Sequence, residues 1–100
     1  MTPCEVVFSL AAKSQLVDLE AYLARRFYPG NAERYVYRLA KACLKLNIAP
    51  FRGTQRNDLG AGIRRIGFER NVTIYFKVTE EQIIILNVLY RGRTPASLRG

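Results

Sequence analysis

Histidine is absent from this 100-residue sequence, and cysteine occurs only as Cys4 and Cys43. Without histidine, the chain cannot build an imidazole metal site, a Ser-His-Asp triad or a Cys-His nucleophile. Two cysteines are too few for a disulfide framework or a cysteine metal motif. Cys43 falls on an apolar helix face, so we expect it to be a small core residue. We therefore expect no metal, no cofactor and no catalytic residue of these classes.

Long apolar segments are also missing. The longest run, Ile83 to Leu86, has the length of a strand and falls far short of the ~20 residues that span a membrane. Residues 1–5 carry neither the basic region nor the apolar region of a secretory signal. These absences predict a cytoplasmic protein that does not interact with a membrane.

Acidic residues are scarce in comparison with basic ones. The sequence has 16 lysines and arginines against 8 acidic residues, which gives a net charge of +8 and a pI near 10.0. Such a surplus indicates an anionic partner, either nucleic acid or an acidic protein segment. The alternative is that the charge only keeps a small protein in solution. The length of the chain favours a single domain over residues 1–100.

The first half of the chain has the pattern of a short strand followed by two helices. Residues 5–8 are β-prone, and Ser9 can cap the helix that follows. The apolar face of that helix recurs at spacings of three and four and consists of Ala12, Leu16, Leu19, Leu23 and Phe27. Residues 28–31 interrupt it, and Asn31 is a candidate N-cap for the second helix.

The second helix combines an apolar stripe with a basic row on its opposite face. The stripe consists of Ala32, Val36, Leu39, Cys43 and Leu46. The basic row consists of Arg34, Arg38, Lys41 and Lys45. Like charges at these spacings repel, and no acidic residue lies between them. We therefore weigh two interpretations equally: a solvated helix face, or a binding surface for an acidic partner.

In the second half of the chain the apolar period changes to two. Strands are predicted at 63–68, 72–78 and 83–90, after a loop over 47–58 and with turns at 69–71 and 79–81. In 72–78 an apolar face alternates with a wetter one that includes Tyr75. Segment 83–90 is apolar almost throughout, which is typical of an interior strand. The sequence predicts an α+β fold of order β-α-α-β-β-β, a helical hairpin packed on a mainly antiparallel sheet.

Several basic and tyrosine side chains are expected on or near an open surface of this sheet. Alternation sends Arg64 and Arg65 to opposite faces of their strand. One of them can join a group suited to binding carboxylates or phosphates, which consists of Tyr75, Lys77, Tyr90, Arg91 and Arg93. The alternative for Arg64 is a structural salt bridge with Glu69 or Asp58.

The order of these segments resembles the ParE toxins of the RelE/ParE superfamily, the toxic halves of bacterial toxin–antitoxin pairs. The resemblance covers essentially the whole chain. It is carried by the opening strand, Ser9 to Ala12 and the helical hairpin, and then by three segments: Arg56 to Arg64, Asn71 to Val78, and Ile83 to Tyr90 followed by Arg91-Gly92-Arg93.

The resemblance implies two partners. ParE-like toxins are held inactive by a ParD-like antitoxin, whose acidic, initially disordered C-terminal segment wraps the toxin. The free toxin acts on DNA gyrase and blocks replication. On this basis the basic row of the second helix is the candidate antitoxin surface. Arg64, Arg65, Tyr75, Tyr90, Arg91 and Arg93 are the candidates for target binding.

Two other functions remain open. A RelE-like ribosome-dependent mRNA endonuclease shares the fold, and Arg64 matches its sheet arginine, with Arg52 and Arg56 nearby. Residues 94–100 contain no tyrosine or histidine to act as general acid or base, so Tyr90 would have to serve. A plain nucleic-acid-binding module would also explain the charge, but no recognition-helix, zinc or aromatic-platform signature is present.

Overall fold

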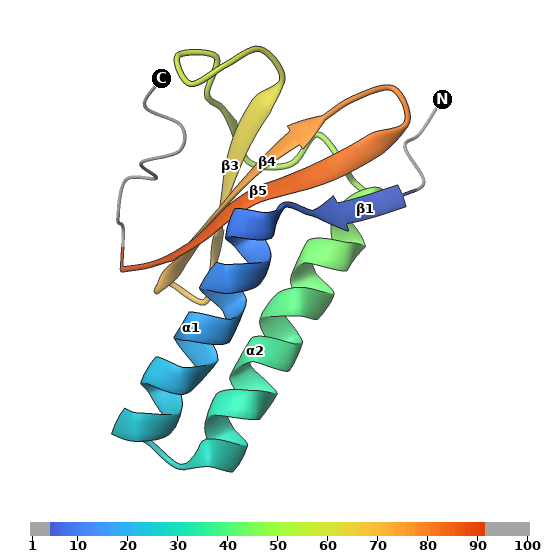
Figure 1. Cartoon of the computed structure of the whole chain (residues 1–100). Helices are drawn as coiled ribbons and strands as arrows, with labels where there is room; N and C mark the ends of the chain where they lie inside the picture. The colour runs from blue at the N-terminus through green and yellow to red at the C-terminus, as the bar shows by residue number, and fades with distance from the viewer. Residues whose placement is uncertain (1–4, 92–100) are drawn as a thin grey trace.

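The computed structural model describes residues 5–91. Two helices lie side by side and antiparallel against a twisted sheet, joined at one end by a tight connection (Figure 1). The elements in chain order are β1 (Glu5–Phe8), α1 (Leu10–Arg26), α2 (Pro29–Leu44), a 3-10 turn η1 (Lys45–Asn47), β2 (Thr54–Gln55), β3 (Ile63–Phe68), β4 (Val72–Val78) and β5 (Gln82–Tyr90).

Helix α1 begins at the predicted cap. The Ser9 hydroxyl accepts a hydrogen bond from the Ala12 backbone N–H at 3.0 Å, which satisfies one of the free N–H groups of the first turn. The inner face of the helix is buried at Ala12, Leu19 and Leu23. Phe27, expected on the same apolar face, is instead the C-cap and is 59% exposed. The expectation for Phe27 was wrong because the helix ends before this turn can pack on the core.

Helix α2 begins earlier than the sequence suggested. Its N-cap is Tyr28, and Pro29 occupies the first turn, where its fixed φ fits the helix and its missing N–H is not needed. The prediction of Asn31 as the cap was wrong. The apolar stripe is confirmed at Ala32, Leu39 and Cys43, which are buried.

The sheet has five strands in the order β1-β5-β4-β3-β2. β1 runs parallel to β5, and the other pairs are antiparallel. This confirms a helical hairpin on a mainly antiparallel sheet, with β5 in its interior. Strand β2 was not predicted, because its two residues lie inside a loop-like segment. Gly53 precedes it with φ of +79°, and a Cβ there would lie 2.2 Å from the Arg65 carbonyl oxygen.

A bulge in β5 decides which of its side chains face the helices. Register shifts opposite Tyr75 and Phe76, so that Phe76 pairs with Ile85 and Tyr75 with Asn87, with Leu86 between them. Strict alternation would put Asn87 on the helix side together with Ile85. The bulge moves Asn87 to the other face and brings Val88 into the main core instead.

The two faces of the sheet carry separate apolar clusters. The main core lies between the helices and the sheet and is centred on fully buried Phe76, Leu39 and Ile85. A smaller cluster on the opposite face consists of Ile63, Tyr75 and Leu89, with Leu59 and Leu86 packed against it. The face expected to be wet is therefore partly covered by the loop that carries Leu59.

Candidate functional site

The face of the sheet turned away from the helices is less open than the sequence suggested. Tyr75 was expected on an open surface, but it is only 6% exposed. It was misplaced because alternation gives the face of a side chain and not what covers that face. Arg65 pairs with Tyr75 across β3 and β4 and is exposed. Lys77, two residues after Tyr75, is also exposed, so Arg65 and Lys77 remain available for contact on this face.

Arg64 lies on the helix side of β3 and holds a loop. Its guanidinium donates hydrogen bonds to three backbone oxygens, those of Phe51 at 2.6 Å, Arg52 at 2.9 Å and Gly53 at 3.3 Å. The same group lies 5.8 Å from the centre of the Phe51 ring. Arg64 and Arg65 thus point to opposite faces, as predicted. The alternative of a salt bridge from Arg64 to Asp58 or Glu69 was wrong.

Both of those acids pair with other arginines. Arg56 binds Asp58 with two hydrogen bonds of 2.9 Å, and this pairing lowers the pKa of Asp58 and raises the pKa of Arg56. Arg38 binds Glu69 with bonds of 3.0 and 3.1 Å, and its hydrogen bond lowers the pKa of Glu69. All four side chains are at the surface, so screening limits what each pair contributes to stability.

The end of β5 brings together part of the expected strand-end group. The ring of Tyr90 lies 5.8 Å from that of Tyr22 on α1. The Arg91 guanidinium lies 5.3 Å from the Tyr90 ring, and its hydrogen bond with the Tyr90 hydroxyl raises the pKa of Arg91. The backbone N–H of Arg91 donates to the Asn71 carbonyl at 2.6 Å, so the strand end is fixed to the β3–β4 turn. Arg93 lies outside the described residues.

The basic row of α2 is only partly neutralised. Arg38 is paired with Glu69, and Arg34 donates a hydrogen bond to the Asn31 side chain one turn earlier. Lys41 lies over the Tyr37 ring at 5.5 Å. Within residues 5–91, Arg34, Lys41 and Lys45 form no ion pair with an acid. Three positive charges of the row are therefore available to an acidic partner.

Exposed apolar side chains lie on the outside of the hairpin, two of them on α2 beside this row, and the sequence reasoning missed them. Leu10 and Val17 on α1, and Tyr37 and Leu44 on α2, are between 49% and 82% exposed. Each pair is seven residues apart, close to two turns, and lies opposite the buried stripe of its own helix. We call these four residues the outer hairpin surface. The repeated seven-residue spacing was the signal that could have revealed it.

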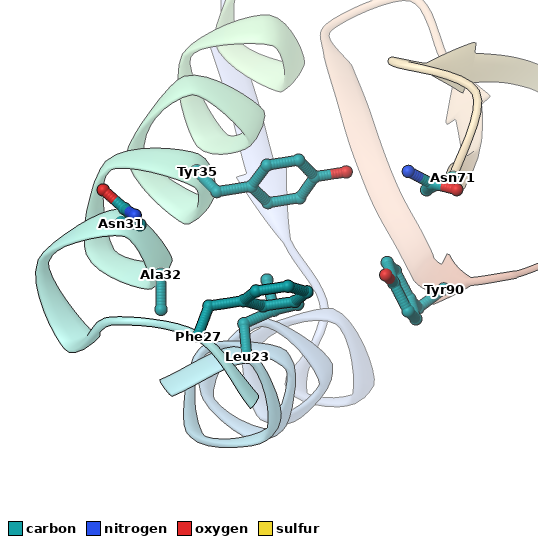
Figure 2. Close-up of a pocket in the computed structure, with 7 residues that line it drawn as sticks. All are labelled: Leu23, Phe27, Asn31, Ala32, Tyr35, Asn71 and Tyr90. Atoms are coloured by element: carbon teal, nitrogen blue, oxygen red, sulfur yellow. The ribbon is translucent and has the colours of Figure 1, made fainter. Parts of the chain in front are cut away.

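A hollow of about 280 Å³ opens at the other side of the hairpin, where α1 ends, α2 begins and β5 stops. Figure 2 shows the Tyr35 ring reaching across it toward Asn71, with Phe27 below and Tyr90 on the facing wall. We call this hollow the strand-end pocket; its lining residues are Leu23, Phe27, Asn31, Ala32, Tyr35, Asn71 and Tyr90. The Tyr35 hydroxyl is buried and has no hydrogen-bond partner among the described residues.

Among residues 5–91, no three acidic or cysteine side chains gather as metal ligands. Burial raises the pKa of the Cys43 thiol to about 12, so it stays protonated and unreactive. What the described surface offers is binding: unpaired cations, exposed apolar side chains and a pocket.

Comparison with known proteins decides the family. The model of the ParE toxin of the type II toxin–antitoxin system parDE matches residues 6–95. The chain belongs to the ParE toxin family. A search of curated protein sequences finds no match. None of the helices described for this ParE family member is long and apolar enough to cross a membrane.

Two solved structures share the ParE fold of this chain. One is the chromosomal ParDE toxin–antitoxin system from P. aeruginosa, with a TM-score of 0.78 and 18% identity over 92% of this chain and 100% of that chain. The other is the toxin–antitoxin complex RelBE2 from Mycobacterium tuberculosis, with a TM-score of 0.63 and 20% identity over 93% and 97%. At these identities the likeness shows the fold alone.

Proposed function

We propose that this ParE family toxin acts in the cytoplasm by binding DNA gyrase and blocking replication until a ParD-like antitoxin neutralises it. The observation that carries the proposal is the match to the ParE family model over residues 6–95. The match covers most of the folded chain. A protein-binding inhibitor also needs no general acid or base, which suits a chain without histidine.

The use of the arginines favours this mode of action over RNA cleavage. An endonuclease needs cations free to stabilise charge on a phosphate. Here Arg64 binds the backbone of the 51–53 loop, and Arg56 is bound by Asp58. Tyr75, on the other side of the same strands, is buried. Two of the three basic residues that a RelE-like site would use are therefore engaged within the fold.

The outer side of the hairpin suits the acidic C-terminal segment of an antitoxin. Its apolar part, the outer hairpin surface, can bury the nonpolar face of a helix that folds on binding. Arg34, Lys41 and Lys45 lie alongside without acidic partners and can meet carboxylates on that helix. This arrangement supports the proposal that the basic row of α2 binds the antitoxin.

Two activities measured side by side test the proposal. Purified toxin is added to a DNA supercoiling assay with gyrase, and in parallel to a ribosome-dependent mRNA cleavage assay. We expect inhibition of supercoiling and intact mRNA, and we expect the antitoxin to abolish the inhibition of supercoiling. Cleavage of mRNA without inhibition of gyrase would assign the chain to the RelE-like activity.

Substitution at the strand end tests the target surface. Arg91→Ala combined with Arg93→Ala is expected to weaken growth arrest while the circular dichroism spectrum stays unchanged. Lys13→Ala combined with Arg70→Ala removes the same charge from other exposed positions and serves as the matched control. Equal toxicity of the strand-end variant and the unaltered chain would remove Arg91 and Arg93 from the target surface.

A further inference from the structure

We propose that the strand-end pocket receives one large apolar side chain from an acidic segment of the antitoxin. The pocket lies between the helical hairpin and the sheet end, separate from the outer hairpin surface. The proposal extends the antitoxin part of the proposed function and does not depend on what the free toxin inhibits.

The walls of the pocket suit an aromatic or branched aliphatic side chain. Leu23 and Ala32 form its base, while the rings of Phe27 and Tyr90 face its interior (Figure 2). Phe27 is 59% exposed at the end of α1. A hollow of about 280 Å³ has room for one such side chain. Covering these surfaces removes nonpolar area from water, which favours binding.

The Tyr35 hydroxyl gives the pocket a hydrogen-bond donor that a peptide can use. It is shielded from water and has no hydrogen-bond partner within residues 5–91. A buried hydroxyl without an acceptor is costly, so an incoming acceptor recovers that free energy. Burial and the nearby Glu69 carboxylate raise the pKa of Tyr35, so the hydroxyl keeps its proton and can donate it. A main-chain carbonyl next to the inserted side chain supplies such an acceptor.

The charges around the mouth favour acidic flanking residues. Arg91 lies over the Tyr90 ring, and Arg26 lies 5.5 Å from the ring of Tyr22, which packs on Tyr90. Glu69, the acid that influences Tyr35, is already bound by Arg38. Carboxylates that flank the inserted residue on the Tyr90 side would therefore meet unpaired cations.

A nucleobase is the competing occupant, since it also stacks on aromatic rings beside arginines. Its edges carry hydrogen-bonding groups all round. Asn71 and the Tyr35 hydroxyl could pair with some of them and the Asn31 oxygen is already bound by Arg34, but the apolar side chains of Leu23, Phe27 and Ala32 would leave the others without partners. The lining therefore favours a hydrocarbon side chain over a base.

Short acetylated peptides test the proposal with the full-length toxin in NMR titrations. One peptide has a central phenylalanine between acidic residues; a second has alanine at the centre, and a third has glutamine flanks. We expect the first to shift the signals of Tyr35, Asn71 and Tyr90, with at least tenfold tighter binding than either of the others.

Variants of the pocket sharpen the test. Ala32→Leu fills the hollow from α2 and is expected to abolish binding of the first peptide, whereas Ala21→Leu makes the same change on the exposed face of α1 and leaves binding intact. Tyr35→Phe keeps the ring, removes the hydroxyl and is expected to weaken binding three- to tenfold. It tests the pocket even if Ala32→Leu fails to fold.

Several results would overturn the proposal. These are equal binding of the phenylalanine and alanine peptides, unchanged binding by both pocket variants, or shifts confined to the outer hairpin surface. Tighter binding of a short oligonucleotide at the same signals would assign the pocket to a nucleobase. If Leu98→Ala shifts the NMR signals of Tyr35 and Tyr90 without any peptide present, the pocket would be assigned to the chain's own C-terminal segment. None of these measurements uses gyrase, so the pocket proposal can be refuted without affecting the proposed inhibition of gyrase.

Discussion

Arg64 is a charged residue whose guanidinium binds backbone carbonyls of its own chain. Its three backbone acceptors belong to consecutive residues, Phe51 to Gly53, which lead into the two-residue strand β2. So short a strand makes few ladder hydrogen bonds of its own. The planar guanidinium, with several donors in a fixed geometry, can hold three neighbouring carbonyls at once.

Arg64→Gln is therefore expected to loosen this loop. Hydrogen bonds from a charged donor to the backbone are lost, and we expect the free energy of unfolding to fall by about 1–3 kcal/mol. Amide hydrogen exchange at residues 51–55 should quicken. Arg65→Gln is the matched control, because Arg65 is adjacent and exposed. Equal losses in the two variants in denaturant titrations would contradict the assigned role of Arg64.

The buried Cys43 thiol is expected to make the free energy of unfolding depend on pH in the alkaline range. Its pKa is raised by burial from 9.0 to about 12, so the unfolded chain releases the thiol proton at lower pH than the folded chain. Its contribution is fully present below pH 9.0 and is lost as pH rises toward about 12, at up to about 1.4 kcal/mol per pH unit. Cys43→Ala should lose less stability between pH 8 and pH 11 than the unaltered chain. If urea titrations show the same loss in the free energy of unfolding for Cys43→Ala and for the unaltered chain, this prediction is refuted.

At the scale of elements, the start of α1 and the bulge of β5 stabilise each other. The Ser9 hydroxyl donates to the Leu86 carbonyl at 2.8 Å and also caps α1. The Gln15 side chain, nearly two turns further on, accepts from the Val88 N–H at 2.7 Å. β1 pairs with β5 only as far as Ile85. Side chains of α1 therefore satisfy backbone groups of β5 that β1 does not reach.

Ser9→Ala tests this coupling. It removes the cap and the bond to the bulge together, so we expect a loss of about 1–2 kcal/mol in the free energy of unfolding. Ser14→Ala alters an exposed serine of the same helix and should change stability little. Thermal unfolding of both variants gives the comparison, and similar melting temperatures would mean that the cap contributes nothing.

At the scale of the whole molecule, some of the surplus positive charge is neutralised within the fold and the rest is free to bind a partner. The described ion pairs use Arg38 and Arg56. The unpaired cations of α2 lie beside exposed apolar side chains on one side of the hairpin. An acidic partner would therefore be attracted at a distance and held by contact on the same side.

Association with the antitoxin should accordingly depend on salt. Lys41→Gln combined with Lys45→Gln is expected to slow association about three- to tenfold at low ionic strength. The difference should shrink in 1 M salt, where the screening length is about 3 Å. Arg65→Gln combined with Lys77→Gln removes equal charge from the face of the sheet turned away from the helices. Equal slowing by both pairs in stopped-flow measurements would show that only net charge matters.

Local periodicity was enough to predict most of the fold. The Ser9 cap, the buried faces of both helices, the interior strand 83–90 and the opposite directions of Arg64 and Arg65 all depend on spacings of two, three or four residues. Such spacings fix the direction of a side chain relative to its own element. The order of the segments also indicated the ParE family, which the family model confirmed.

Contacts between distant segments decided the rest. β1 joins β5 in parallel, β2 forms directly after a loop that Arg64 holds, and the bulge at Leu86 changes which side chains of β5 reach the core. Tyr75 is buried by a loop, and the strand-end pocket joins residues from both helices and two strand ends. The sequence thus determined the elements, their faces and a basic surface. Tertiary structure decided which charges are used internally, because pairing depends on neighbours that local spacing does not specify.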